Sequence, residues 1–452
     1  MSRRSLSRST LVAGLLLSAS LQAAHAADVA PAKPTPGWWD TFTVYGVIDA
    51  GLLVNPAYPA NGLNFGQLYT DKANSLMLNQ FQVTATRPID STSKDYDFGF
   101  KFQGIYGSDA RYTHFLGELD YAIDSRYQID IIEANVQAHL PWLVSGGIDV
   151  KVGQFPSIQG EEYIDPTLNY FYSHSYIFNF GIASKLTGAA FVAHVIPEVD
   201  IYAGVNTGNN TGFGWPGDNN NGAGFEGGIG LNLLGGNLTA VATTNIGPQN
   251  PATPLGDLTC LCYPSDTLRF YNDLVVTWKA TDKLTFVGEG NYVHDDTHQF
   301  SGGANAYGGA GYVSYVINDW LKINGRAEVW RDAEGFYVSS TGVDGNFNFV
   351  NAEHGYANYG ATTNPAYVGF FGGFPPAGTF APPTTYLELT AGLNISAPPI
   401  PNVFNLPKEA WIQSVTVRPE IRYDASLNNT TPFDVGTKSS QWTFGGDILV
   451  KF

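Results

Sequence analysis

Sustained alternation of apolar and polar residues is the feature of this sequence that most constrains its fold. In "DYDFGFKFQGIYG", Phe98, Phe100 and Phe102 share one face, and Lys101 and Gln103 fall on the other. The same pattern recurs in "TFTVYGVIDAGLLV", "DKLTFVGEGNYV", "DWLKINGRAEVWRD" and "IQSVTVRPEIRYD". Because successive side chains of a β-strand point to opposite faces, each segment is predicted to be a strand with one apolar and one polar face.

The connections between the predicted strands alternate between long and short. Short turns such as "PIDSTSK", "PWLVSG", "IPEV", "LGG", "ATD" and "IND" follow every second strand, and only "APPIPNVFNLPKE" is long where a short turn is expected. Long loops on one side and short turns on the other are typical of outer-membrane barrels, whereas a soluble β-sandwich has no reason to show them. The pattern predicts an all-β fold, a transmembrane antiparallel β-barrel of about 16 strands, within a range of roughly 14–18. The barrel is expected at residues 41–452, after a periplasmic lead at 27–40.

The C-terminal sequence "SQWTFGGDILVKF" continues the alternation to the last residue, with Ile448, Val450 and Phe452 on one face. This ending resembles that of bacterial outer-membrane β-barrel proteins, whose last strand is a signal to the barrel assembly machinery. The alternative is an ordinary edge strand that ends in phenylalanine. The resemblance implies that this machinery and the outer-membrane lipids are partners of the chain.

The N-terminus has the anatomy of a secretory signal peptide. Arg3, Arg4 and Arg8 precede the apolar run "LVAGLLLSASL", and Ala24 and Ala26 form a small-x-small cleavage site. Because the apolar run is too short for a spanning helix, this segment is predicted to be removed after export. The alternative is a buried N-terminal helix. The expected location is the bacterial outer membrane.

Net charge and cysteine content exclude several partners and cofactors. The formal net charge is −17, and removal of the three signal arginines lowers it to −20. A chain this acidic is not expected to bind nucleic acid or an anionic lipid surface. Cys260 and Cys262 are the only cysteines. They could form a local loop disulfide or bind a soft metal, and we expect the disulfide because two ligands cannot complete a zinc site. No metal and no cofactor are predicted.

Tryptophans near the ends of predicted strands indicate aromatic girdles at the membrane interfaces. They are Trp278, Trp320, Trp330, Trp411 and Trp442. Ordinary packing is the alternative for any one of them.

Charged residues on the polar strand faces must point away from lipid and into the lumen. A barrel of this size is wide enough to keep an aqueous channel. The sequence therefore predicts an outer-membrane porin for passive diffusion of small hydrophilic solutes or ions. The predicted wall bases are Arg326, Arg418, Arg422, Lys322 and Lys101, and the other predicted lumen charges are Glu328, Glu420, Asp424, Glu289 and Glu133. Alternatively, these charges pair across strands and only stiffen the wall.

The loop at residues 155–184 follows the predicted fifth strand and carries Glu161, Glu162 and Asp165. In a closed ring of sixteen strands this loop lies opposite strands thirteen to fifteen, which carry the three arginines. If the loop folds inward, acids and arginines face each other across a constriction, and the transverse field sets the ion preference. The alternative is that these carboxylates only pin the loop to the wall.

The sequence "VKVGQFPSIQGEEYIDPTLNYFYSHSYIFNFG" resembles a strand and loop of the OmpL-like β-barrel porin family. The matching features are Gly153 and Phe155, Gly160 and Glu161, Asp165 and Pro166, and the run "NYFYSHSY" followed by Phe178 and Gly181. The chain has His174 where the family pattern favours arginine. The resemblance implies a porin-like channel and leaves open its solute and whether it forms a homotrimer.

Two other functions compete with the channel. A hydrolase would use Glu161, Glu162, Asp165, His174 and a serine at 173 or 175. Adjacent glutamates point to opposite sides of an extended chain, and no Gly-x-Ser-x-Gly or HExxH motif occurs, so no catalytic residue is predicted and the chain is not expected to be an enzyme. A surface adhesin or receptor would use the long loop at 332–382, which is equally typical of a flexible surface loop.

Overall fold

The structure is a computed structural model that describes residues 37–114, 119, 122–123, 125–209, 212, 222–248, 268–296, 301–338, 383–397 and 412–452. These residues form sixteen strands: β1 (Thr43–Val54), β2 (Met77–Arg87), β3 (Asp97–Gly107), β4 (Gln128–Leu140), β5 (Ile148–Pro156), β6 (Lys185–Ile196), β7 (Val199–Asn209), β8 (Gly224–Leu233), β9 (Leu238–Pro248), β10 (Leu268–Lys279), β11 (Leu284–Asp295), β12 (Ala304–Asn318), β13 (Leu321–Asp332), β14 (Thr384–Ala397), β15 (Ser414–Ser426) and β16 (Ser440–Lys451). The helices are short: Trp38–Thr41, Asp109–Tyr112, Pro166–Leu168, Ile177–Gly181, Leu234–Gly236 and α3 (Phe433–Gly436). Within these described ranges, no helix is long and apolar enough to cross a membrane.

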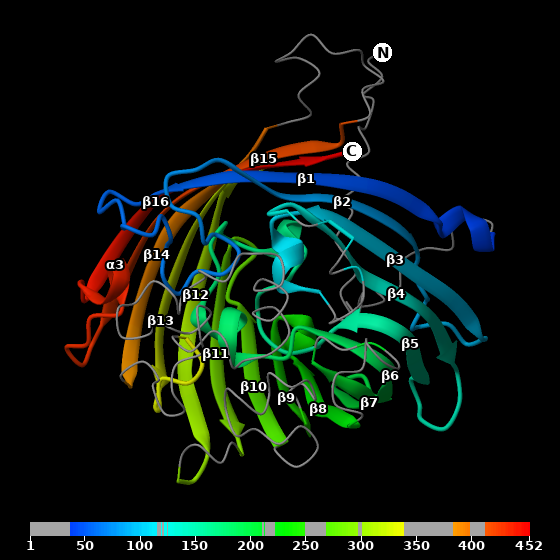
Figure 1. Ribbon diagram of the computed structural model, residues 1–452. Helices are drawn as coiled ribbons and strands as arrows, with labels where there is room; N and C mark the ends of the chain where they lie inside the picture. The colour runs from blue at the N-terminus through cyan, green and yellow to red at the C-terminus, as the bar shows by residue number, and fades with distance from the viewer. Residues whose placement is uncertain are drawn as a thin grey trace, which may run out of the picture.

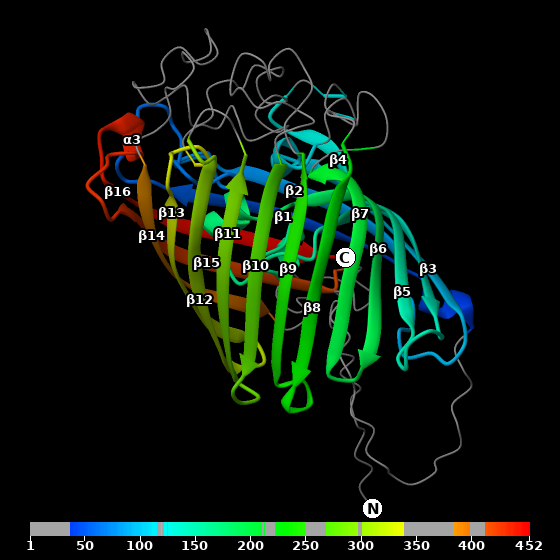
Figure 2. The ribbon, with the colours of Figure 1, turned by 90° about the horizontal axis from the view of Figure 1, so that it is seen from below.

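The strands form one closed ring in which every neighbour in the chain is a neighbour in space (Figure 1). All sixteen pairs of described strands are antiparallel, and β1 closes the ring against β16. Figure 2 shows the strands from the side, with α3 at the end of the barrel opposite to the turn between β8 and β9. The predicted antiparallel barrel and its strand number are therefore confirmed.

The alternation of residues explains which face of each strand points to lipid. On β3, the side chains of Phe98 and Phe102 are 57% and 44% exposed on the outside, whereas Gln103 is 2% exposed on the inside. The outer face of the barrel must be apolar because nothing in the hydrocarbon region can solvate a charge. A period of two is the pattern that a strand with these two environments requires.

The ring closes through the last residue of the chain. Gly46 donates its N–H to the carbonyl of Phe452 at 2.8 Å, and the N–H of Phe452 returns to the carbonyl of Gly46 at 3.0 Å. The tip of the phenylalanine ring lies where any side chain at position 46 would have its Cβ, so a larger residue there would have to displace this ring. Val450 and Ile448 pair with β1 in the same register. The C-terminal segment with alternating residues is thus the strand that closes the barrel against β1.

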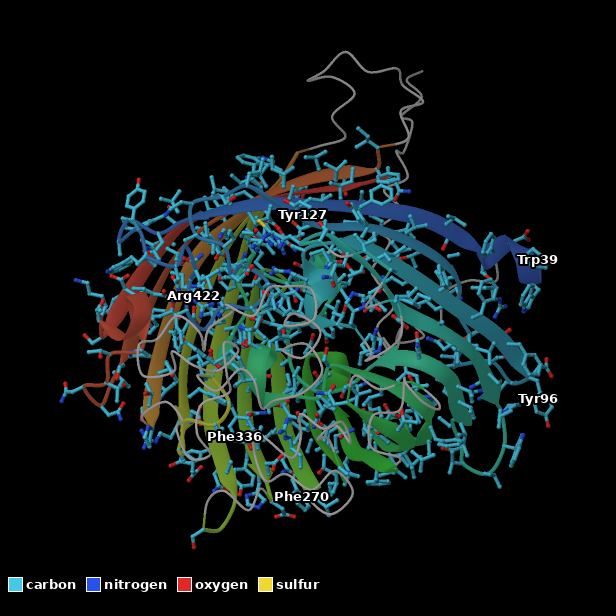
Figure 3. All side chains as sticks on the ribbon, in the orientation of Figure 1. Trp39, Tyr96, Tyr127, Phe270, Phe336 and Arg422 are labelled. Carbon is cyan, nitrogen blue, oxygen red and sulfur yellow. The ribbon has the colours of Figure 1, made fainter. Side chains whose placement is uncertain are left out.

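Tryptophans occupy two different environments. Those exposed near strand ends are Trp278, Trp320 and Trp442. Trp330 is not in a girdle, and this part of the prediction was wrong: its side chain is fully buried inside the barrel, where its ring nitrogen donates to Asn291 at 3.4 Å. The reason is the alternation of side chains along β13, because Trp330 stands two residues from Glu328 and therefore shares its inward face. In Figure 3, Trp39 and Tyr96 lie on the outer rim.

Several predicted features lie outside the described residues. They are the signal cleavage site at Ala24 and Ala26, the pair Cys260 and Cys262, Trp411, and most of the loop at 332–382. The first residues of that loop are described. Asp332 accepts the backbone N–H groups of Phe336, Tyr337 and Val338, each at 2.9 Å.

The connection between β5 and β6, residues 157–184, enters the barrel and lies within the ring of strands (Figure 1). We call it the inner loop. Its aromatic residues Tyr176 and Phe180 pack with Trp330 and Tyr386 in a buried cluster inside the barrel. The barrel therefore has an internal core, and the inner loop is part of it.

Candidate functional site

Wall carboxylates hold the backbone of the inner loop. Glu328 on β13 accepts the N–H groups of Tyr176 and Ile177 at 2.7 and 2.8 Å. Glu420 on β15 accepts those of residues 172 and 173 at 2.8 and 3.2 Å. A carboxylate with two oxygens matches two successive N–H groups, and such charge-assisted bonds are stronger than neutral ones. These two lumen glutamates therefore fasten the loop to the wall.

Arg326 on β13 joins the inner loop to two carboxylates. Its guanidinium forms ion pairs with Glu162 of the loop and with Glu388 of β14, where the Nε–Oε2 distance is 3.0 Å. It also donates to the carbonyl of Ser173 at 2.9 Å and lies 5.1 Å from the centre of the Phe171 ring. Five donors in a planar fork allow one arginine to satisfy all these groups.

Arg418 on β15 likewise joins the wall to the inner loop, at residues that come earlier in the sequence of the loop. It forms an ion pair with Asp447 of β16 and donates to the carbonyls of Pro166 and Asn169 at 2.8 and 2.9 Å. The carbonyl of Asn169, at the end of the short helix at 166–168, is therefore satisfied by the wall, and the carbonyl of Pro166 accepts Arg418 in addition to the N–H of Asn169.

Arg422, labelled in Figure 3 inside the ring, completes the series. It pairs with Asp424 at 2.7 Å and donates to the carbonyl of His174 at 2.5 Å. Asp424 also accepts from the Tyr176 hydroxyl at 3.1 Å. The three predicted wall arginines thus touch the loop directly and do not face it across an opening. We call this face of the loop, toward β13–β16, its bound side.

Glu162 belongs to the bound side. Besides Arg326, it binds His174 Nδ1 at 2.9 Å and accepts the N–H of Ser175 at 3.0 Å. Burial raises the pKa of this carboxyl, but the charge of Arg326 and the bond to His174 outweigh burial and lower its pKa to about 2. Glu162 is therefore ionised, and it pins the loop.

Glu161, the adjacent residue, has different surroundings. Its N–H donates to Glu289 Oε1 at 3.2 Å, and the N–H of Gly160 donates to Asp273 at 3.2 Å. Its own carboxylate has no hydrogen bond or ion pair to a described residue, and it is partly exposed. Burial first, and then the charges of Glu162 and Asp273, raise its pKa to about 8.

Asp165 ties the loop to the other wall of the barrel. It caps the short helix at 166–168 by accepting the N–H of Thr167 at 3.0 Å. Its second oxygen accepts from Gln82 on β2 at 3.1 Å and from Gln103 on β3 at 3.4 Å. The inner loop is therefore held on both sides of the lumen.

The predicted lysines divide into a paired and an unpaired group. Lys101 on β3 forms an ion pair with Glu133 of β4 at 2.5 Å. Lys322 is exposed near the start of β13 and has no ion pair with a described residue. Lys151 on β5, which was not among the predicted site residues, likewise has none, and its ammonium lies 5.6 Å from the centre of the Phe155 ring. Lys101 and Lys151 keep partial exposure.

Several residues of the site were missed by sequence reasoning. They are Glu388, Asp447, Asp273, Glu226 and Tyr312. Tyr312 donates its hydroxyl to Glu289 at 3.1 Å, and Glu226 accepts the N–H of Ile158 at 3.0 Å. Each missed residue stands on the polar face of its strand, so the alternation places it in the lumen, but it carries no signal for the contact it makes. No cluster of three or more histidine, cysteine or acidic residues among those the structure describes is arranged to bind a metal ion.

Several solved structures share this fold. A loop-deletion mutant of OmpT from Vibrio cholerae is 10% identical with a TM-score of 0.50, and the match covers 91% of this chain and 100% of that chain. An anion-selective porin from Comamonas acidovorans is 10% identical with a TM-score of 0.50, covering 91% and 99%. OprB from Pseudomonas putida is 12% identical with a TM-score of 0.50, covering 91% and 94%. No curated protein matches the sequence significantly.

The family model described as "Putative beta-barrel porin-2, OmpL-like" matches residues 41–452, which is the whole barrel. The family consists of outer-membrane channels and not of enzymes. The closed barrel, the inward polar face and this match agree, and the chain belongs to the OmpL-like family of outer-membrane β-barrel porins.

Proposed function

We propose that small hydrophilic solutes and ions diffuse passively through a water-filled passage between the inner loop and the β3–β8 wall, with the loop as the constriction. The observation that carries this proposal is a difference in exposure. Arg326, Arg418 and Arg422 on the bound side are all at most 3% exposed. Glu161 and Lys151, which form no ion pair with those arginines, are both partly exposed. We call this second face of the loop its open side.

A row of small residues supports the position of the passage. Lys151 on β5 lies directly opposite Ala190, which lies opposite Gly204, which lies opposite Glu226 on β8. Directly opposite residues share a face of the sheet, so this row points into the lumen. Only alanine and glycine separate the two charged residues. The side chains in the middle of this row are smaller than the arginines and tyrosines of the bound side.

Above a pH of about 8, where Glu161 is ionised, the charges of the open side favour cations, because its two loop carboxylates outnumber Lys151, which has no ion pair with a described residue. Glu161 and Asp165 stand on the loop without a cation within ion-pair distance among the described residues. Lys101 is compensated by Glu133. A ring of carboxylates at a constriction raises the local concentration of cations. The proposal is therefore a weakly cation-preferring channel, and the identity of its natural solute is a separate question.

The test combines single-channel current with chemical accessibility. In a background with Cys260 and Cys262 replaced by serine, Lys151→Cys and Thr443→Cys are compared. Thr443 points inward on β16 and is fully buried behind the loop. In planar bilayers, a charged thiosulfonate reagent is expected to reduce the KCl current of Lys151→Cys within seconds and to leave Thr443→Cys unchanged.

Two outcomes would contradict the proposal. Absence of any single-channel current in purified protein would exclude the channel. Equal reaction of both cysteines would show that water passes on both sides of the loop. Detergent-refolded protein with unchanged heat-modifiability on gels serves as the control for folding of both variants.

The predicted partners belong to the proposal as well. Recognition of the last strand by the barrel assembly machinery is supported by the position of Phe452 at the seam of the barrel. Replacement of Phe452 by alanine is expected to lower the amount of barrel in the outer membrane at unchanged synthesis. Export by a signal peptide and assembly as a homotrimer stay predictions, which N-terminal sequencing of mature protein and light scattering of detergent-purified protein would test.

A further inference from the structure

Glu161 is the carboxylate of the inner loop that has no partner among the described residues. The other carboxylates near the loop accept hydrogen bonds or pair with an arginine, as Glu328 does with the N–H of Tyr176 and Glu162 with Arg326. The carboxylate of Glu161 accepts no hydrogen bond from a described residue, and water reaches it. A partly buried carboxylate without a partner is costly, and the cost falls when a cation binds. This position is therefore a candidate binding site within the passage.

Two tyrosines flank this carboxylate. Tyr163 follows Glu161 by two residues, and the side chain of Asn169, the neighbour of Tyr170, accepts the N–H of Tyr163 at 2.8 Å and donates to its carbonyl at 2.7 Å, so both tyrosines belong to the turn that carries Glu161. Burial, and after it the charge of Glu161, raises the pKa of both hydroxyls. Both side chains are partly exposed, and the ring of Tyr170 lies 6.2 Å from that of Tyr312 on β12. The carboxylate therefore lies beside exposed aromatic surface.

The backbone holds Glu161 in a fixed position. Gly160 has a φ of +83°, a left-handed conformation that disfavours other residues, and a Cβ there would meet the side chain of Ile182. The N–H groups of Gly160 and Glu161 are both bound to wall carboxylates. The side chain thus projects from an anchored turn, and a ligand does not have to order it.

We propose that Glu161, with Tyr163 and Tyr170, binds the protonated amino group of small organic solutes as they cross the constriction. This inference rests on the proposed channel function. A carboxylate supplies the charge-assisted hydrogen bond to an ammonium, and aromatic faces attract both the cation and the apolar carbon chain attached to it. A neutral sugar would lack the first interaction. An inorganic cation would keep its water and gain little from the rings.

Phenethylammonium chloride is a suitable probe because it combines an ammonium group with an apolar ring. In planar bilayers with KCl at pH 9, where the carboxyl of Glu161 is ionised, its addition is expected to interrupt the single-channel current reversibly, whereas benzyl alcohol at the same concentration has no effect. Glu161→Gln is expected to raise the half-blocking concentration about tenfold. Tyr170→Leu is expected to raise it about threefold, and Tyr170→Phe to retain native block.

Glu198→Gln, the same chemical change in the exposed turn between β6 and β7, is the matched control. Its half-blocking concentration for phenethylammonium is expected to equal that of the native channel. Current without block by the ammonium, or equal block of native protein and Glu161→Gln, would overturn the inference and leave the channel function standing. Absence of KCl current in native protein would overturn both. Block that weakens in Glu161→Gln but not in Tyr170→Leu would remove the aromatic part of the proposal.

Discussion

The two sides of the inner loop differ in how they treat charge. On the bound side, Arg326, Arg418 and Arg422 are buried, and each is paired with a carboxylate and with loop carbonyls. On the open side, Glu161 and Lys151 are exposed to water and unpaired within the described residues. The same residue types therefore serve to fix a loop in one place and to meet a solute in the other. Burial and pairing, not residue type, separate the two roles.

This difference follows from the cost of a buried charge. A charge that leaves water must find a partner, and removal of one partner strands the other. The bound side consequently allows little change without loss of stability. Charges on the open side keep part of their hydration, so they can change with little effect on stability while they alter the field in the passage.

The largest expected effect comes from removal of a guanidinium on the bound side. Arg326→Met leaves Glu162 buried without its arginine and Glu388 with only Arg422 at 3.9 Å, and we expect a loss of about 3–5 kcal/mol in the free energy of unfolding. Lys322→Met, on the same strand and inner face but exposed, is expected to change it by less than about 0.5 kcal/mol. Denaturant titration in detergent micelles measures both. Similar losses in the two variants would remove the distinction between the sides.

The next largest effect on stability is expected from the two adjacent glutamates, Glu161 and Glu162. Glu162→Gln loses charge-assisted bonds to Arg326 and Ser175, and we expect a cost of about 1.5–3 kcal/mol. Glu161→Gln removes no described hydrogen bond of the side chain, and its stability is expected to stay within about 0.5 kcal/mol of native. The same titration applies. A more stable Glu162→Gln variant would show that the ion pair costs more than it contributes.

The pH dependence of the cation preference tests whether Glu161 on the open side sets it. Because the pKa of Glu161 is raised to about 8, its carboxyl is mostly protonated below that pH and ionised above it. The cation preference of native channels is therefore expected to rise as the pH increases from 7 to 9. Reversal potentials in a KCl gradient measure it. The rise should be absent in Glu161→Gln, and a rise that persists there would assign the titration to another group.

The smallest effect is expected at Asp165. Asparagine keeps the cap on the short helix at 166–168, so Asp165→Asn should fold normally. Its loss of charge is expected to lower cation preference less than Glu161→Gln, because the ammonium of Lys101 lies near enough to offset part of the Asp165 charge. Reversal potentials compare it with Asp95→Asn in an exposed turn, which should match native protein. A larger effect than that of Glu161→Gln would place the narrowest point nearer to β2 and β3.

Alternation predicted the strands well because the membrane enforces it on each strand separately. The same rule accounts for the error at Trp330. A tryptophan near a strand end suggested the membrane interface, whereas its place in the alternation of β13 puts its side chain inside the barrel. An aromatic side chain in this lumen packs against the inner loop, as Tyr176 and Phe180 do. Phase was the better guide than residue type.

Partners within the site could not be predicted from alternation. Glu328 and Glu420 were placed in the lumen, but their acceptance of loop N–H groups depends on how residues far apart in sequence meet in space. The position of the loop between the fifth and sixth strands did predict its proximity to β13–β15. It did not predict that Arg326 would contact Glu162. The order of the strands tells which part of the wall the loop faces, but not how far the loop reaches across the lumen.

The inner loop is synthesised well before the walls that hold it. Tyr176 precedes Glu328 by 152 residues, and Tyr172 precedes Glu420 by 248. Contacts this distant in sequence form late, because the chain between them must first be ordered. Asp165, by contrast, binds Gln82 and Gln103 of strands that precede the loop. The bound side is complete only when the strands of the second half of the chain arrive, so the loop is fastened on both sides only as the barrel closes.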